Sequence, residues 1–408
     1  MAYQQTLQVE PTVSPAPPAF YEYGFYAVMT YAHLGLAWGL NVPSMGATAL
    51  VLLAVACLVN VRFRIVKVFI PIGFALCCGV SVIAVQVAIH SDDSFAETTP
   101  FMTWLIMLII VRTLSLREGF LHRFALAALG MGLLTLPFLS FDYGDGAIRA
   151  SVRGTGLSNP NVLALWFGFC YVYFLVLGIE TRTLAVRVVA WSIACGCLYV
   201  VGITVSRGAL LGLAAASVIA FQRSLKQSAF LTLFLVLVSS IVYQSGLFDS
   251  IMDFFVERGT QETGREILWP LAFQRFLDSP WEGVGLAQSY MTLGSKLVGP
   301  HNGFLYIALA CGLVPLAFFL AYMVHAGWGA FHADPKRSPD APFLPPLFVL
   351  ALVKIIVSDE SFMSLWIIVA LTCAVSTTHS FPRERLLNPE ISSIEAERMW
   401  TRRASGIG

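Results

Sequence analysis

His301 and Asn302 stand together directly before a long apolar run, HNGFLYIALACGLVP. A neutral imidazole, with an ordinary pKa of about 6.5, can accept the proton of an attacking hydroxyl group. An asparagine at the start of a helix can accept a hydrogen bond from one of the first backbone N–H groups. The pair therefore predicts either a general base beside a substrate or a helix cap at a membrane surface.

Three arginines, Arg153, Arg207 and Arg265, could supply a second kind of chemistry. Arg207 lies in a short turn between two apolar runs, whereas the other two lie in longer polar segments. A guanidinium is permanently charged, and its planar fork binds two phosphate oxygens at once. These residues indicate a phosphate-binding site, although arginines near a bilayer surface also extend to lipid headgroups without any catalytic role.

His90, together with Asp92 and Asp93, is a weak metal-binding pattern. Two adjacent carboxylates and one histidine are also typical of a solvated acidic loop, which is the interpretation we favour. We therefore expect no metal and no cofactor. A metal-dependent enzyme similar to an oligosaccharyltransferase, using Asp92 or Asp93, is kept as an alternative.

Membrane helices must position these residues. The chain has 408 residues, of which 57% are hydrophobic and 12% charged, whereas soluble proteins carry about 25% charged residues. This composition excludes the soluble and nucleic-acid-binding classes. We expect an all-α polytopic membrane protein with about twelve transmembrane helices, at 22–40, 44–60, 68–89, 99–115, 121–140, 161–179, 187–205, 208–222, 228–246, 302–325, 343–358 and 361–378.

The orientation follows from the basic residues. Most of the 25 Lys and Arg residues lie in alternate connections and in the C-terminal tail, and the positive-inside rule makes that side cytoplasmic, with both termini inside. The longest outer connection begins with apolar and charged residues at helical spacing, which predicts a surface helix within an outer cap. The expected order is a disordered tail (1–21), nine helices (22–246), the cap (247–300), three helices (301–378) and a second tail (379–408).

Lys354 is the one Lys or Arg residue that lies more than three residues inside an expected span, in the outer half of that span. An unpaired charge inside a transmembrane helix costs about 2.5–3.5 kcal/mol on insertion scales. We therefore expect Lys354 to pair with Asp359 or Glu360, or to face the substrate.

Four segments of the sequence resemble the bacterial O-antigen ligase and O-antigen polymerase superfamily. SRGALL, at 206–211, contains the ligases' R-x3-L element, and HNGFLYIALACG, at 301–312, matches their H-[NSQ]-x9-G element. RGTGLSNPN, at 153–161, and the segment GREILW to SPWEGVG, at 264–285, look like two other outer segments of the family. Pro315 departs from the family at the last position of the histidine element.

The resemblance implies a membrane glycosyltransferase of the C-type fold, acting at the periplasmic face of the bacterial inner membrane. The implied donor is a glycan carried on undecaprenyl diphosphate. In a ligase the acceptor is a sugar on the lipid A core, and in a polymerase it is a second lipid-linked glycan. By the family pattern, Arg207 and Arg265 hold the diphosphate and His301 acts at the acceptor, in an inverting, metal-independent transfer that makes lipopolysaccharide.

The R-x3-L and His-Asn elements favour a ligase over a polymerase. Arg153 and Lys354 are further candidates for diphosphate binding, and Asn302 for positioning the acceptor. A transporter or lipid-glycan flippase with about twelve spans is the alternative from another class, although carriers usually bind substrates near the middle of the membrane. Here the candidate charges gather at the outer face.

Overall fold

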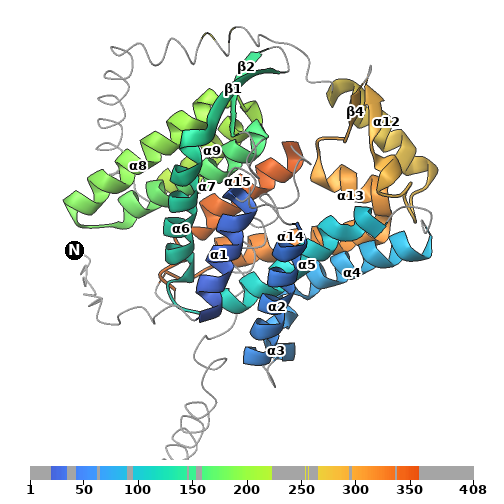
Figure 1. Ribbon diagram of the computed structural model, residues 1–408, viewed down its shortest axis with the longest axis horizontal. Coiled ribbons are helices and arrows are strands. Elements are labelled where there is room, and N and C mark those ends of the chain that lie inside the picture. The colour runs from blue at the N-terminus through green and yellow to red at the C-terminus, as the bar shows by residue number, and fades with distance from the viewer. Residues whose placement is uncertain are drawn as a thin grey trace, which may run out of the picture.

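The computed structural model is dominated by apolar helices (Figure 1). It describes residues 20–34, 43–61, 65–89, 95–144, 147–152, 159–222, 253, 256, 265–293, 296–335 and 338–357. The expected spans 228–246 and 361–378 and the expected C-terminal tail lie outside these residues, as does the expected N-terminal tail apart from Phe20 and Tyr21, which belong to α1. The helices are α1 (Phe20–Leu34), α2 (Pro43–Val61), α3 (Ile65–Phe69), α4 (Gly73–Ala88), α5 (Phe95–Ser115), α6 (Phe120–Thr135), α7 (Pro160–Glu180), α8 (Leu184–Ile203), α9 (Arg207–Phe221), α12 (Arg265–Asp278), α13 (Gly303–Cys311), α14 (Leu313–Phe331) and α15 (Leu344–Val357).

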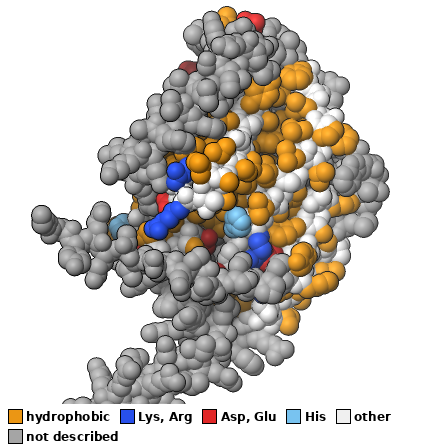
Figure 2. Space-filling model, turned by 90° about the vertical axis from the view of Figure 1, so that its left-hand side faces the viewer, with side chains coloured by type: hydrophobic (Ala, Val, Ile, Leu, Met, Phe, Trp, Pro, Cys, Tyr) orange, Lys and Arg blue, Asp and Glu red, His pale blue; other side chains and the backbone are white. Residues whose placement is uncertain are grey.

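Several of these helices are suited to a bilayer. Across the described ranges, five segments are long and apolar enough to cross a membrane, at Ile70–Ala88, Phe120–Phe138, Pro160–Glu180, Leu184–Ile203 and Leu313–Phe331. Large hydrophobic side chains also stand exposed on their outer surfaces, as on α8 and α14. Figure 2 shows one face of the molecule on which hydrophobic side chains predominate. Because such a surface is unfavourable in water, the structure supports a multi-pass membrane protein.

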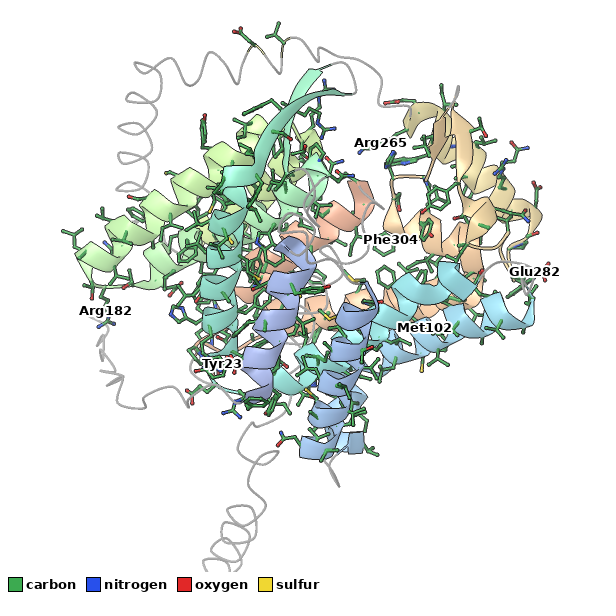
Figure 3. The ribbon with its side chains drawn as sticks, in the orientation of Figure 1. Tyr23, Met102, Arg182, Arg265, Glu282 and Phe304 are labelled. Atoms are coloured by element: carbon green, nitrogen blue, oxygen red, sulfur yellow. The ribbon has the colours of Figure 1, made fainter. Side chains whose placement is uncertain are left out.

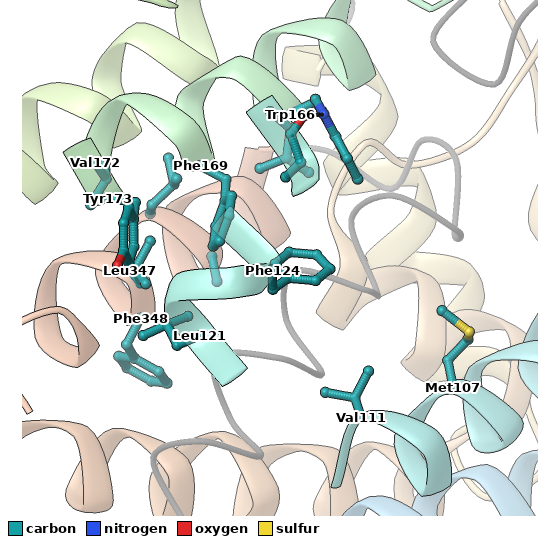
Figure 4. Packing of buried hydrophobic residues seen from close by; sticks show 14 of the residues in the cluster. Met107, Val111, Leu121, Phe124, Trp166, Phe169, Val172, Tyr173, Leu347 and Phe348 are labelled. Carbon is teal, nitrogen blue, oxygen red and sulfur yellow. Dashed lines mark hydrogen bonds between the residues drawn. The ribbon is translucent and has the colours of Figure 1, made fainter. Parts of the chain in front are cut away.

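The main hydrophobic core surrounds α7, which is buried over nearly its whole length. Aromatic rings from three neighbouring helices meet there (Figure 4). Phe124 of α6 packs edge-on against Phe169 of α7, with ring centroids 5.4 Å apart. Tyr173 of α7 stacks on Phe343, just before α15, at 4.7 Å. This packing holds α6, α7 and α15 together, and the start of α7 and the end of α15 both belong to the candidate site.

A buried carboxylate anchors α1, which begins the described chain. Glu22 is fully buried and accepts two hydrogen bonds from Arg123 of α6, at 2.7 and 3.0 Å. The hydroxyl of Tyr26 donates a third, at 2.8 Å. Pairing and hydrogen bonding offset the cost of burying the charge, and they fix the register of α1 against α6.

The outer cap forms a small unit beside α13 (Figure 1). The expected surface helix is present as α12 and ends before Pro280. Its buried side chains, Leu268 and Ala272, pack with Met291 and Leu309 in a second hydrophobic cluster. A 3-10 turn, η4 (Ala287–Ser289), and the hairpin of β3 (Met291–Leu293) and β4 (Lys296–Val298) complete the unit.

Two features differ from the expectations. The end of the 121–140 span and the connection after it contain a hairpin, β1 (Leu139–Gly144) and β2 (Ala147–Val152), paired antiparallel. Asp-Gly at 145–146 is the dipeptide typical of two-residue hairpin loops, so the signal was present in the sequence. The expected single helix at 302–325 is two helices, α13 and α14, which meet at Gly312. The protein is thus mostly helical rather than purely so.

Candidate functional site

His301 occupies a strained position at the start of α13. It has a positive φ of 50° and is half-buried, a conformation that costs a side chain bearing a Cβ about 1–3 kcal/mol. Asn302 caps the helix, since its side-chain oxygen accepts from the N–H of Leu305 at 3.0 Å. On the other side, the carbonyl of Pro300 accepts from the indole N–H of Trp269 at 2.8 Å. The ring is therefore held between a helix cap and α12 of the outer cap.

Val205 is the second strained residue, with a φ of 53°. It lies two positions before Arg207, which is the first residue of α9. His301 and Val205 are the two non-glycine residues with positive φ within the part of the chain that the structure describes. Backbone strain of this kind clusters at functional sites, and here it coincides with two of the segments that carry the sequence resemblance.

Arg149 and Asn161 hold the turn before Arg207. The guanidinium of Arg149 is buried and donates to the carbonyl of Thr204 at 3.0 Å and to the side-chain oxygen of Asn161 at 3.1 Å. The same oxygen accepts from the hydroxyl of Ser206 at 2.8 Å. The sequence analysis gave Arg149 no role, and the segment SNPN was the only signal for Asn161. Both are positioning residues for the start of α9.

Arg265 and Gly208, the residue after Arg207, approach the same residue at the end of α15. Arg265, the first residue of α12, donates to the carbonyl of Val357 at 2.7 Å. Figure 3 shows it on the side of the outer cap nearest α15. Gly208, next to Arg207, lies so close to Val357 that an added Cβ would be 2.6 Å from its side chain. The structure thus brings the starts of α9 and α12 together at one point.

Lys354 belongs to the same region. It lies three residues before Val357 on α15 and is 2% exposed, so the amine is removed from solvent. Asp359 and Glu360, the partners suggested for it, lie outside the described residues, as do Arg153, His90, Asp92 and Asp93. Among the described residues, no group of three His, Cys, Asp or Glu side chains could hold a metal ion.

The His301 loop and Arg265 are tied to one helix. Arg265 and Trp269 are one turn apart on α12, or about 6 Å along its axis at about 1.5 Å per residue. One contacts Val357 and the other the residue before His301. Helix starts carry a partial positive charge, and the start of α9 adds it to the guanidinium group of Arg207. The arrangement suits a ligand with negative charge at one end and a reacting hydroxyl near His301.

Close backbone contact joins the outer cap to the break between α13 and α14. The N–H groups of Val284 and Gly285 donate to the carbonyls of Leu309 and Ala310, at 2.8 and 3.1 Å. An added Cβ on Gly312, whose φ is 81°, would clash with the carbonyl of Trp281. The cap backbone thereby satisfies the carbonyls that end α13. This contact explains the glycines at 285 and 312, one in each of the two motifs that meet here.

Gln86 of α4 strengthens the same junction between the cap and the break at Gly312. The sequence analysis did not predict this role. Gln86 is 2% exposed. Its amide nitrogen donates to the carbonyl of Ala310 at 3.2 Å, and its oxygen accepts from the N–H of Leu286 at 3.1 Å. A polar residue on a helix with otherwise apolar buried residues was the available signal.

The comparisons with known proteins bear on this region. Residues 191–320 match the sequence model of a family described as O-antigen ligase. No curated protein matches the chain. The matched segment contains Arg207, Arg265, His301 and Gly312, and it confirms the resemblance that the motifs indicated.

Replacing Gly312 with alanine should destabilise the protein by about 3 kcal/mol, because strain at positive φ adds to a clash with the Trp281 carbonyl. The measurement is the unfolding temperature of the purified protein in detergent. Gly196→Ala on α8, where an added Cβ meets nothing within 4 Å, is the matched control and should leave that temperature nearly unchanged. Equal stability of the two variants would contradict the close contact.

Proposed function

We propose that this chain, whose match supports the O-antigen ligase and polymerase superfamily, is a membrane glycosyltransferase that moves a glycan from undecaprenyl diphosphate to a hydroxyl of an acceptor sugar. The acceptor we favour is the lipid A core, which makes the protein a ligase of lipopolysaccharide assembly. The reaction takes place at the periplasmic face of the inner membrane, and twelve spans with both termini in the cytoplasm give the chain this orientation. The observation that carries the proposal is the meeting of Arg265 and the start of α9 at Val357, one helical turn from the His301 loop.

Arg207 and Arg265 bind the diphosphate in this proposal. Arg265 and the residue after Arg207 both lie against Val357, so two guanidinium groups and the helix dipole of α9 favour the same anion. The bond to Val357 orients Arg265 toward α15 and α9. Lys354 adds a third positive charge from α15, and Arg153 is a further candidate to complete the site. A charged group in a partly dehydrated site acts more strongly than one at an exposed surface, where an ion pair contributes about 0–1 kcal/mol.

The transfer needs one bond formed and one broken. The hydroxyl oxygen of the acceptor attacks C1 of the donor sugar, and the C1–O bond to the diphosphate breaks with its electron pair leaving on the diphosphate. The arginines stabilise that developing charge. The proton of the hydroxyl passes to the ring of His301, which acts as the general base. Because attack and departure take place on opposite faces of C1, the configuration at C1 inverts.

Asn302 has a positioning role in this scheme. As the cap of α13 it holds the residue before it at a fixed place relative to the helix start. Pro300, anchored through Trp269, holds the other side. A base held in this way keeps its geometry between turnovers, which is the usual source of rate enhancement from orientation.

The carrier alternative draws support from one observation, because a broken helix such as α13–α14 is typical of transporters. In transporters the backbone groups released at the break face the substrate or ion. Here the carbonyls that end α13 accept hydrogen bonds from the outer cap and from Gln86. The break therefore serves the docking of the cap, and the geometry favours the enzyme over the carrier.

Reconstituted protein supplied with a lipid-diphosphate glycan should join that glycan to lipid A core oligosaccharide, with a free lipid diphosphate as the second product. Each acceptor is supplied in turn and the products are separated by gel electrophoresis and mass spectrometry. Elongation of the lipid-linked glycan with no product on lipid A core would instead assign the polymerase activity. Movement of the donor across the membrane of sealed vesicles, with no glycan joined to either acceptor, would contradict the assignment as a glycosyltransferase.

The His301→Asn variant should lower the transfer rate by about 10²–10⁴-fold, the usual contribution of a general base. Asparagine tolerates positive φ better than most residues, so the loop keeps its conformation and donor binding stays unchanged. His332→Asn, at an exposed position after α14, is the matched control. A His301→Asn protein that transfers glycan at the wild-type rate would remove the base assignment.

The Arg207→Lys and Arg265→Lys variants should each weaken donor binding by about tenfold, because lysine keeps the charge but loses the two-pronged hydrogen bonding. Binding is measured with undecaprenyl diphosphate itself in nanodiscs. The control is Arg182→Lys at an exposed position (Figure 3). Wild-type affinity for undecaprenyl diphosphate in both variants would mean that these arginines contact only lipid headgroups.

A further inference from the structure

The outer cap contains a cavity at the end of α12 opposite to Arg265. Its volume is about 440 Å³, and it is lined by Arg275, Asp278, Val284, Gln288 and Tyr290. Apart from Val284, whose backbone N–H bonds to α13, none of these residues belongs to the site described above. The cavity is formed by the last turn of α12 on one side and by the chain leading through η4 to β3 on the other.

The walls of the cavity are fixed to the helix that His301 precedes. Val284 donates its N–H to the carbonyl of Leu309 on α13, at 2.8 Å. Tyr290 packs edge-on against Tyr306 of the same helix, with ring centroids 6.2 Å apart. Arg275 donates across the cavity to the carbonyl of Gln288 at 3.5 Å. The cavity is therefore largely formed before a ligand arrives, which lowers the entropy cost of binding.

The chemistry of the lining suits a saccharide. Sugar hydroxyl groups both donate and accept hydrogen bonds. Arg275 donates, Asp278 accepts and Gln288 does both, so the lining matches this double character. The ring of Tyr290 offers an apolar face together with a hydroxyl. The carboxylate of Asp278 disfavours a diphosphate, which separates this cavity from the arginine site.

The position of the cavity along α12 defines which part of a glycan it could receive. Trp269, which contacts the His301 loop, and Asp278 are nine residues apart, or about 14 Å along the helix at about 1.5 Å per residue. A single sugar is shorter than this distance. Sugars further along the same chain can reach the cavity, because a glycan of several residues extends over such a distance.

We propose that this cavity is a saccharide subsite that binds glycan residues remote from the bond being made. The inference rests on the proposed function for its substrate class and deepens it. The subsite holds either the glycan of the donor or the oligosaccharide of the acceptor, which share the chemistry that the lining recognises. It selects among glycans by their distal sugars, while the arginine site recognises the diphosphate common to all donors.

The test uses the full-length protein in nanodiscs and two free oligosaccharides. One is released by mild acid from the lipid-linked glycan of the producing organism, and the other is delipidated core oligosaccharide. Binding is measured by saturation-transfer difference NMR and by titration calorimetry. One of the two should bind the wild type, which identifies whether donor or acceptor occupies the subsite, and inorganic diphosphate should not displace it.

The variants Asp278→Asn and Gln288→Ala should each weaken that binding by about tenfold, the effect of losing a hydrogen bond to a charged or well-placed polar group. Both side chains are exposed, so the fold is retained. Glu282→Gln, an exposed acidic position outside the cavity (Figure 3), is the matched control and should bind as the wild type does.

Three results would overturn the subsite: no binding of either oligosaccharide, full affinity in both variants, or displacement by inorganic diphosphate. The proposed function is tested separately, by transfer from a lipid diphosphate carrying a single sugar, with the wild-type protein alone. Transfer without oligosaccharide binding leaves the function and removes the subsite. Binding without transfer leaves the subsite and removes the proposed function.

Discussion

The backbone contact between the outer cap and the break at Gly312 is the constraint on which the rest of the site depends. A helix that ends inside apolar surroundings leaves carbonyl groups without partners, at a cost of several kcal/mol each in hydrocarbon. Here the cap supplies the N–H groups of Val284 and Gly285. The cap therefore has one place to dock, and that place sets the position of α12 relative to the membrane helices.

The rest of the site follows from where α12 begins. Its first turn carries Arg265 to the end of α15 and Trp269 to the loop before His301. A single rigid helix thus links a cation to an imidazole that lies in a separate segment of the sequence. The opposite end of the same helix forms the wall of the cavity with Asp278. One element consequently positions Arg265, the segment before His301 and one wall of the cavity, so the helix sets their spacing.

Strain and buried charge mark the same region. His301 and Val205 adopt positive φ, and Lys354 is almost fully removed from solvent on α15. Each is unfavourable for folding, at about 1–3 kcal/mol for the strained residues. The capping by Asn302 and the buried bonds of Arg149 compensate locally. A fold selected for stability alone would not concentrate these costs at one end of three neighbouring helices.

The class, the apolar helices, the helix in the cap and the candidate residues His301, Arg207 and Arg265 could be predicted from the sequence, because hydropathy, helical spacing and short motifs are local properties. Only the folded chain showed that the run after Asn302 breaks at Gly312 and that Val357 lies against both Arg265 and Gly208, the residue after Arg207. It also assigned roles to Gln86 and Arg149. These features depend on contacts between segments far apart in the chain. Local sequence patterns carry no information about which distant backbone groups will hydrogen-bond to the carbonyls at a helix break or to a buried polar side chain.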